Sequence, residues 1–151
     1  MPQNAFMKTS MAKMRVKANL VFLDATYLIA LAVPRDQFHG QAMSLLEEVE
    51  AGRVKMITTR AVSLEFANSL ANPQKRTNAV QTLESFEQDP QVEIVPLSEE
   101  LFGGAFGLFR HRMDKAWGLT DCIHSWSCKS AEFPRRSLPT NILNKPVLSR
   151  F

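Results

Sequence analysis

The sequence predicts an α/β domain built around a mainly parallel sheet. Three short apolar runs are typical of buried strands, and segments with apolar residues at helical spacing lie between them. Strands that alternate with helices in this way pair in parallel through crossover connections. The 151 residues are enough for one domain whose core needs no disulfide bonds.

The first strand is expected in Asn19–Leu23 (NLVFL), which is rich in strand-forming residues. Asp24 and the apolar segment YLIALAV follow, and they predict a turn and a short helix that ends before Pro34. A second helix is expected over 38–54, where apolar residues recur at helical spacing and Gly52 supplies the stop.

The rest of the chain predicts two more strands and three more helices. The strands are KMITT and VEIVPL, and the helices are AVSLEFANSLAN, closed by Asn72-Pro73, then Arg76–Gln88 and SEELFGGAFGLFRHR. Ser98 is expected to cap the last of these helices.

The basic isoelectric point, about 9.1, is a property of the two ends of the chain. Residues 20–123 carry nine Lys or Arg and fourteen Asp or Glu, a net charge of −5. The overall balance is therefore weak evidence for nucleic-acid binding. Cys122 and Cys128 match neither a zinc spacing nor a disulfide framework, which favours a reducing cytoplasm. Asp24 interrupts the amino-terminal apolar run, and no membrane segment is expected.

Four acids are candidates for the chemistry. Asp24 follows the first strand, where ligands bind in open α/β sheets, although it could equally be a helix N-cap. Glu65 lies on a largely apolar helix, where a buried carboxylate needs a partner or a metal; the alternative is a half-exposed glutamate. Asp114 and Asp121 flank DKAWGLTD, where Thr120 could cap a helix and an acid near its start could be structural.

Taken together, these acids suggest a Mg²⁺ or Mn²⁺ site. Clustered carboxylates supply the oxygen ligands that hard cations prefer, and such cations activate water for phosphoryl chemistry. The sequence has no glycine-rich phosphate loop of the G-x-x-x-x-G-K type and no recognisable nucleophilic serine or cysteine.

Over about residues 21–123 the chain resembles the PIN domain family, especially its VapC-like toxins. The resemblance is carried by FLDATYLIAL, PRDQFHGQA, ITTRAVSLEFANSL, VEIVPLSEELFGGAF and DKAWGLTDC, in this order. It implies a PIN-like three-layer fold and a metal-dependent endoribonuclease, with Asp24, Glu65 and Asp121 as metal ligands. Asp114 belongs to the same motif as a catalytic candidate, and Asn68 falls where a polar residue could orient Glu65. RNA, a cognate antitoxin and a homodimer partner are the implied partners.

The resemblance ends after Ile123. The family would continue with a helix, a short strand and a fourth acid in a segment like TTDxHF, but the only later acid here is Glu132. The tail from His124 onward can be written as a DNA sequence that encodes it. When the same DNA is read in another frame, starting from its third base, it encodes FMVLQERGIPEALTTDEHFEQAGFIAL. That string contains the missing acid, and one restored T after the Ile123 codon brings it into register. We interpret residues 124–151 as an out-of-frame tail; a divergent native extension is the alternative.

The predicted layout has three parts. Residues 1–18 are a disordered extension or a misassigned start, 19–123 form the PIN-like domain with an incomplete carboxyl-terminal edge, and 124–151 are the aberrant tail. The sequence leaves two functions open. The chain is either an active endoribonuclease or a non-catalytic, frameshift-damaged remnant that binds an antitoxin or RNA.

Overall fold

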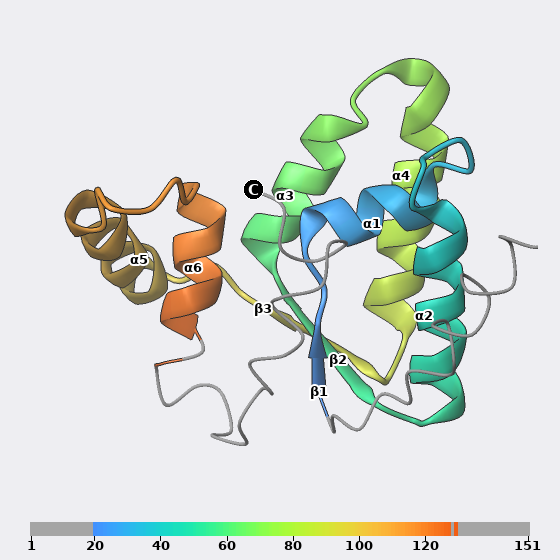
Figure 1. Ribbon diagram of the computed structural model, residues 1–151, viewed down its shortest axis with the longest axis horizontal. Helices are drawn as coiled ribbons and strands as arrows, with labels where there is room; N and C mark the ends of the chain where they lie inside the picture. Colours follow the sequence, from blue (N-terminus) through green and yellow to red (C-terminus); the bar gives the residue numbers. More distant parts are fainter. Residues whose placement is uncertain (1–19, 128, 130–151) are drawn as a thin grey trace, which may run out of the picture.

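The computed structural model describes residues 20–127 and 129, and its elements follow the predicted alternation (Figure 1). In chain order they are β1 (Leu20–Phe22), α1 (Ala25–Ala32), α2 (His39–Ala51), β2 (Lys55–Thr59), α3 (Arg60–Ser69), α4 (Pro73–Gln88), β3 (Val92–Val95), α5 (Glu99–His111) and α6 (Leu119–Ser127). The predicted extension 1–18 and residues 130–151 of the predicted tail lie outside the described residues.

The three strands form one parallel sheet in the order β1-β2-β3. Val21 lies opposite Met56, and Ile57 lies opposite Glu93. The N–H of Leu23 donates to the carbonyl of Ile57 at 2.8 Å, which extends the pairing past the end of β1. This sheet confirms the predicted α/β class and the parallel pairing.

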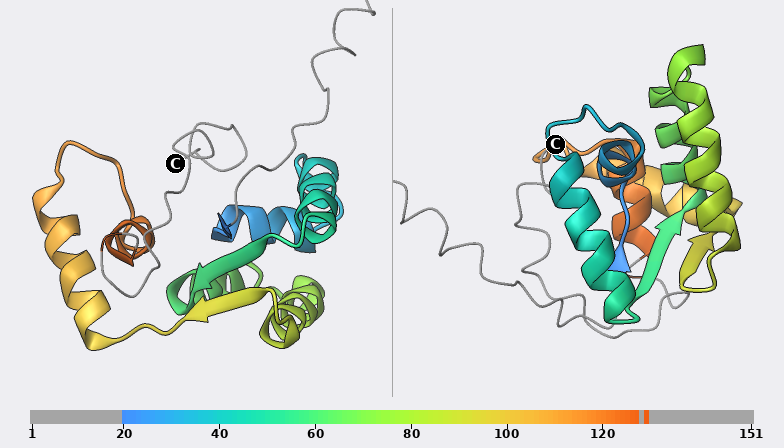
Figure 2. Two further views of the ribbon diagram at one scale, coloured as in Figure 1. Left: turned by 90° about the horizontal axis from the view of Figure 1, so that it is seen from below. Right: turned by 90° about the vertical axis from the view of Figure 1, so that its right-hand side faces the viewer.

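Helices cover both faces of the sheet and create two apolar clusters. Side chains on successive strand residues point to opposite faces. Val21 and Met56 therefore pack with α1, α2, α3 and α4, while Leu20 and Ile57 pack with α5 and α6. Figure 1 shows α2 and α4 to the right of the sheet and α5 and α6 to its left. The result is a three-layer arrangement, which Figure 2 shows from two further sides.

Four of the helices have an N-cap residue whose polar side chain accepts a hydrogen bond from a backbone N–H. They are Asp24 for α1, Thr59 for α3, Asn72 for α4 and Ser98 for α5. The Ser98 cap was predicted. Asn72 is different, because the sequence placed it at the end of the preceding helix. Helix α3 already ends at Ser69, and Asn72 caps α4, with Pro73 in the first turn where its missing N–H costs nothing.

Helix α2 stops at Gly52, as the sequence predicts. Gly52 is the C-cap residue, with a φ of −79°, which lies outside the left-handed region that favours glycine. The left-handed position falls on Arg53, with φ +48°. The turn into β2 is therefore made by a residue with a side chain that disfavours this backbone conformation.

Helices α5 and α6 pack against each other beside the sheet. Helix α6 runs to Ser127, four residues past the boundary predicted at Ile123. Cys122 and Ile123 are buried in the cluster on this face of the sheet. Among the described residues, no helix is long and apolar enough to cross a membrane.

Candidate active site

Asp24 lies directly after β1, at the carboxyl end of the sheet. Its Oδ1 accepts a hydrogen bond from the N–H of Tyr27 at 2.7 Å and so caps α1. Asp24 is thus a helix N-cap, which is one of the two roles that the sequence allowed. The capping role does not exclude a role as a metal ligand. The capping bond engages Oδ1, and a carboxylate has a second oxygen with further lone pairs.

The electrostatic surroundings of Asp24 bring three predicted site residues together. Burial, together with the smaller effect of the negative charges of Asp121 and Glu65, raises the pKa of Asp24 to about 6, against the lowering effect of the hydrogen bond from Tyr27. Each of these acids comes from a different element: the end of β1, α3 and α6. The protein therefore holds a carboxylate at this edge in surroundings that disfavour its negative charge.

Glu65 projects from α3 beside an open groove. The groove has a volume of about 560 Å³ and is lined by Ala61, Leu64, Glu65, Asn68, Ser69, Leu97, Phe102, Leu119, Thr120 and Ile123. Glu65 is exposed, so the burial cost expected from its apolar neighbours does not arise. Asn68 lines the same groove one helical turn later. The apolar part of this lining was not singled out from the sequence, because helical spacing alone assigns such residues to a core.

Asp121 lies in the first turn of α6. Its Oδ2 accepts a hydrogen bond from the N–H of Gly118 at 2.8 Å. The sequence predicted that Thr120 could cap this helix, but it is the Asp121 carboxylate that reaches back to the residue before the helix. This is the reciprocal half of a capping box. Asp121 is exposed, and Thr120 beside it contributes to the groove.

Asp114 is placed apart from the other three acids. It lies in the loop between α5 and α6, where Arg112 donates to both of its oxygens at 2.8 and 3.0 Å. These hydrogen bonds lower the pKa of Asp114. Asp114 is not among the acids whose charges act on Asp24. The structure thus brings Asp24, Glu65 and Asp121 together and leaves Asp114 paired with its near neighbour.

The donor set suits a hard cation in its chemistry, because all three side chains offer carboxylate oxygens. The three carboxylates are, however, farther apart than the ligands of a single enclosed ion. Within residues 20–127 and 129, no three His, Cys, Asp or Glu side chains approach closely enough to enclose one ion. Asp24 and Asp121 each also commit one oxygen to a backbone N–H. The three acids are near enough to interact electrostatically without forming a preassembled site.

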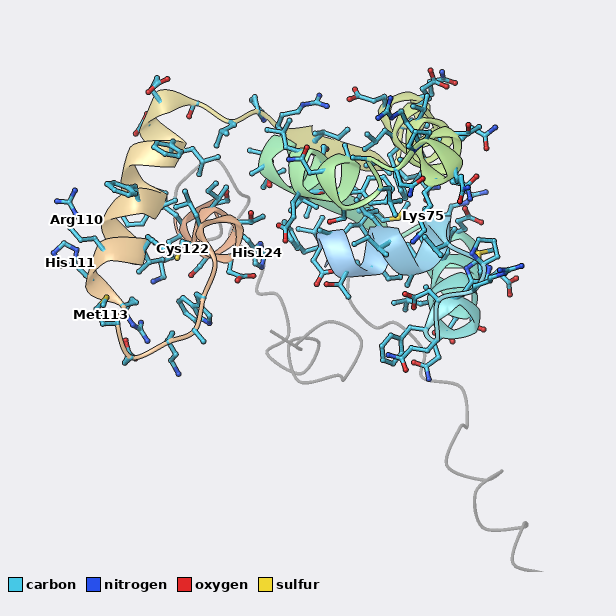
Figure 3. All side chains as sticks on the ribbon, turned by 90° about the horizontal axis from the view of Figure 1, so that it is seen from above. Lys75, Arg110, His111, Met113, Cys122 and His124 are labelled. Atoms are coloured by element: carbon cyan, nitrogen blue, oxygen red, sulfur yellow. The ribbon has the colours of Figure 1, made fainter. Side chains whose placement is uncertain are left out.

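His124 was not selected from the sequence, because it was expected to lie in a loop or at a helix end. In the structure its ring lies against Phe22 of β1, with centroids 3.6 Å apart. Figure 3 shows His124 and Cys122 on α6, between α5 and the rest of the domain. Burial lowers the pKa of His124 to about 4. The imidazole is thus held in its neutral form beside the sheet at physiological pH.

The parallel sheet, its two helical layers and the acids beyond its strand ends define an α/β domain with a carboxylate-lined edge. The model of the PIN domain family matches residues 21–135, and the chain belongs to this family. VapC20 of Mycobacterium tuberculosis, a sarcin–ricin loop cleaving toxin, has a similar crystal structure. The TM-score is 0.61 over 72% of this chain and 81% of that chain, at 16% sequence identity. No curated protein sequence matches the chain.

Proposed function

We propose that this chain is a metal-dependent endoribonuclease of the VapC toxin type. Membership of the PIN domain family and the fold shared with VapC20 support this proposal. The observation that carries it is the grouping of Asp24, Glu65 and Asp121, whose mutual repulsion adds to the cost of ionising Asp24. Carboxylates in such a group lower their free energy when a cation neutralises them.

In this proposal Asp24, Glu65 and Asp121 hold Mg²⁺ or Mn²⁺. A bound ion would supply an activated water and would stabilise charge on the phosphoryl group during RNA hydrolysis. The chain's own residues position the acids. The Tyr27 N–H fixes the Asp24 carboxylate, and the Gly118 N–H fixes that of Asp121. We place Asp114 in the same catalytic motif with an indirect role, because its salt bridge to Arg112 orders the loop before α6.

The proposal includes a cellular setting. A VapC-type toxin acts on RNA in the cytoplasm, is held inactive by a cognate antitoxin and works as a homodimer. The exposed apolar residues Leu64 and Leu97 beside the groove support a protein contact there, because apolar side chains grouped on a surface often mark an interface.

The test compares RNA cleavage by the parent and by Asp24→Asn with Mg²⁺, with Mn²⁺ and with a chelator. Asp89→Asn is the matched control, because Asp89 lies before β3, at the opposite edge of the sheet. We expect cleavage by the parent and by the control only with metal, and little or none by Asp24→Asn. Equal metal-dependent cleavage by Asp24→Asn and the parent would contradict the assignment.

A second function has one specific observation in its favour. Because the described acids do not form a group able to enclose an ion, the chain could be a non-catalytic remnant that binds an antitoxin or RNA. Metal that binds the native state raises the melting temperature. A parent protein that captures a co-expressed antitoxin, but neither cleaves RNA nor gains thermal stability from Mg²⁺ or Mn²⁺, would favour the remnant.

A further inference from the structure

Helix α5 carries a stripe of exposed aromatic residues that ends in a basic residue. Phe102, Phe106 and Arg110 are spaced four residues apart, so they lie on one side of the helix. The exposed fractions of Phe102 and Phe106 are 40% and 41%, far above those of core aromatics such as Phe66, at 0%. Packing within the described chain does not account for these side chains.

The stripe has an ordered geometry. The rings of Phe102 and Phe106 are parallel within 5°, with their centroids 6.1 Å apart. The guanidinium of Arg110 lies over the ring of Phe106, 5.1 Å from its centroid. The contact between the parallel rings and the cation over a π face both stabilise this arrangement of the three side chains.

One end of the stripe reaches the candidate active site. Phe102 lines the groove that also contains Glu65 and Thr120, the neighbour of Asp121. The other end reaches a short basic stretch of the described chain. Residues 110–115 (RHRMDK) hold three Lys or Arg and one Asp, whereas residues 20–123 as a whole carry a net charge of −5. Figure 3 shows Arg110 and His111 projecting outward from the end of α5.

We propose that the stripe Phe102–Phe106–Arg110 is a docking track for single-stranded RNA that leads away from the acidic edge. This inference rests on the proposed nuclease function and adds the residues that hold the substrate strand. Aromatic faces stack on bases without regard to sequence, and a basic residue alongside neutralises phosphate. Because the rest of the domain is acidic, a phosphate backbone is attracted only where positive charge is concentrated.

A protein partner is the competing explanation for exposed phenylalanines. The chemistry along the stripe favours RNA, because Arg110 sits on the aromatic stripe itself and a purely apolar contact would have to bury its charge. A similar pairing recurs nearby, where the Arg112 guanidinium lies 5.2 Å from the centroid of the Trp117 ring. Aromatic and basic groups that lie next to each other and lead from a carboxylate-containing groove are suited to a polyanion with flat bases.

The experiment measures binding apart from cleavage. A fluorescein-labelled single-stranded RNA of about 12 nucleotides, within the range that such surfaces cover, is titrated with the full chain in a chelator and followed by anisotropy. We expect Phe102→Ala and Phe106→Ala each to weaken binding about fivefold or more, and Phe106→Trp to restore it. Arg110→Gln should weaken binding and reduce the salt-dependence slope by about 1.

Matched controls separate docking from general damage. Met43→Ala removes an exposed apolar side chain from α2, and Lys55→Gln removes an exposed charge at the start of β2, the opposite edge of the sheet. Neither should change RNA affinity. Melting temperatures of all variants should stay close to that of the parent, because the replaced side chains are partly exposed.

Cleavage with Mg²⁺ distinguishes this inference from the function on which it rests. If the parent cleaves RNA and Phe106→Ala raises KM with little change in kcat, both stand. Unchanged affinity and KM in Phe102→Ala and Phe106→Ala overturn the track while the nuclease remains. If light scattering also shows that these variants turn a dimeric parent into monomers, the surface is a contact between copies. A parent that neither binds nor cleaves RNA overturns both.

Discussion

The indole of Trp126 on α6 lies directly over Gly104 on α5. A Cβ atom added at Gly104 would come within 2.1 Å of Cε2 and 2.2 Å of Nε1 of this ring. The two helices can therefore approach closely only because residue 104 has no side chain. This contact, together with Cys122 and Ile123, fixes α6 against α5 and so positions Asp121 at the edge of the sheet.

The first prediction concerns this contact. Gly104→Ala should lower the free energy of unfolding by about 1–3 kcal/mol, because the indole must shift out of a packed position. Gly103→Ala is a matched control on the same helix, since nothing lies within 4 Å of the Cβ it would add. That variant should gain about 0.5–1 kcal/mol from better helix propensity. Urea unfolding checks both, and equal effects would contradict the close approach.

Most of the architecture was predictable because it depends on local patterns. The strand KMITT and the Ser98 cap occur where the sequence places them, since apolar runs and capping side chains act within a few residues. Predictions that needed context were less accurate. Asn72 was expected to close the helix before it, but α3 already ends at Ser69 and Asn72 caps α4. The left-handed conformation of Arg53 was not predicted.

In the candidate site, too, the features that depend on local pattern or topology could be predicted, and those that depend on tertiary packing could not. Asp24, at the end of a strand, could be placed from topology alone, because parallel strands bring their carboxyl ends to one edge. The exposure of Glu65 depends on which side of α3 faces the sheet, and helical spacing did not decide it. Asp114 shares a short motif with Asp121 but turns to Arg112, a local pairing that its sequence position alone did not reveal.

The second prediction follows from the raised pKa of Asp24, about 6 against an ordinary value of 3.8. The native state then binds this proton more tightly than the unfolded state. The stability that protonated Asp24 contributes is therefore present in full below about pH 4, and it is lost as the pH rises through 6. In a chelator, Asp24→Asn should therefore be more stable than the parent by about 1–3 kcal/mol at pH 7.5. Near pH 4 the two should be equal.

Asparagine is a suitable replacement because it also caps helices well, so the bond from Tyr27 can persist. Thermal unfolding across this pH range measures the difference. If the variant is less stable than the parent at pH 7.5, the negative charge of Asp24 does not destabilise the native state, and the prediction is wrong.

The third prediction concerns His124 and has the opposite sign. Burial lowers its pKa from 6.5 to about 4, so the unfolded state binds this proton more readily than the native state. The stability that the neutral ring contributes is present above pH 6.5 and is lost as pH falls toward 4. The effect opposes that of Asp24 over the same range, so the parent's own pH dependence should be shallow.

His124→Phe, which keeps a ring against Phe22, should remove the acid-induced loss. We expect the parent to lose up to about 3 kcal/mol more than this variant between pH 7 and pH 4. His111→Phe is the matched control, because His111 lies exposed at the end of α5. Identical pH dependence in the parent and His124→Phe would contradict the burial of a neutral imidazole.

The fourth prediction uses the left-handed turn at Arg53. Arg53→Gly should raise the free energy of unfolding by about 0.5–1 kcal/mol, because glycine adopts a φ of +48° without steric cost. Arg35→Gly controls for the lost charge and for the more flexible unfolded chain, since the φ of Arg35 is not positive. That control should be neutral or slightly less stable. Equal losses at both positions would show that the turn does not require a left-handed residue.

The last prediction concerns the reading frame, which we propose changes after Ile123. The family match runs to residue 135 and α6 runs to Ser127, so the first residues after the proposed break can still complete a helix. Restoring one T after the Ile123 codon would replace Trp126 by methionine, which is flexible enough to pack over Gly104. It would also add the acid of the TTDEHF segment to the three carboxylates described above.

Two measurements test this change of frame. The coding DNA from the Thr120 codon onward is resequenced, and the parent is compared with a chain that carries the restored base. We expect the restored chain to cleave RNA faster with Mg²⁺ and to gain more thermal stability from the metal, because a fourth carboxylate strengthens an otherwise open ligand set. If the restored chain fails to fold, or cleaves no faster than the parent, the printed tail belongs to the native protein. In the proposed function, Asp24, Glu65 and Asp121 would then hold the metal without a fourth acid from TTDEHF.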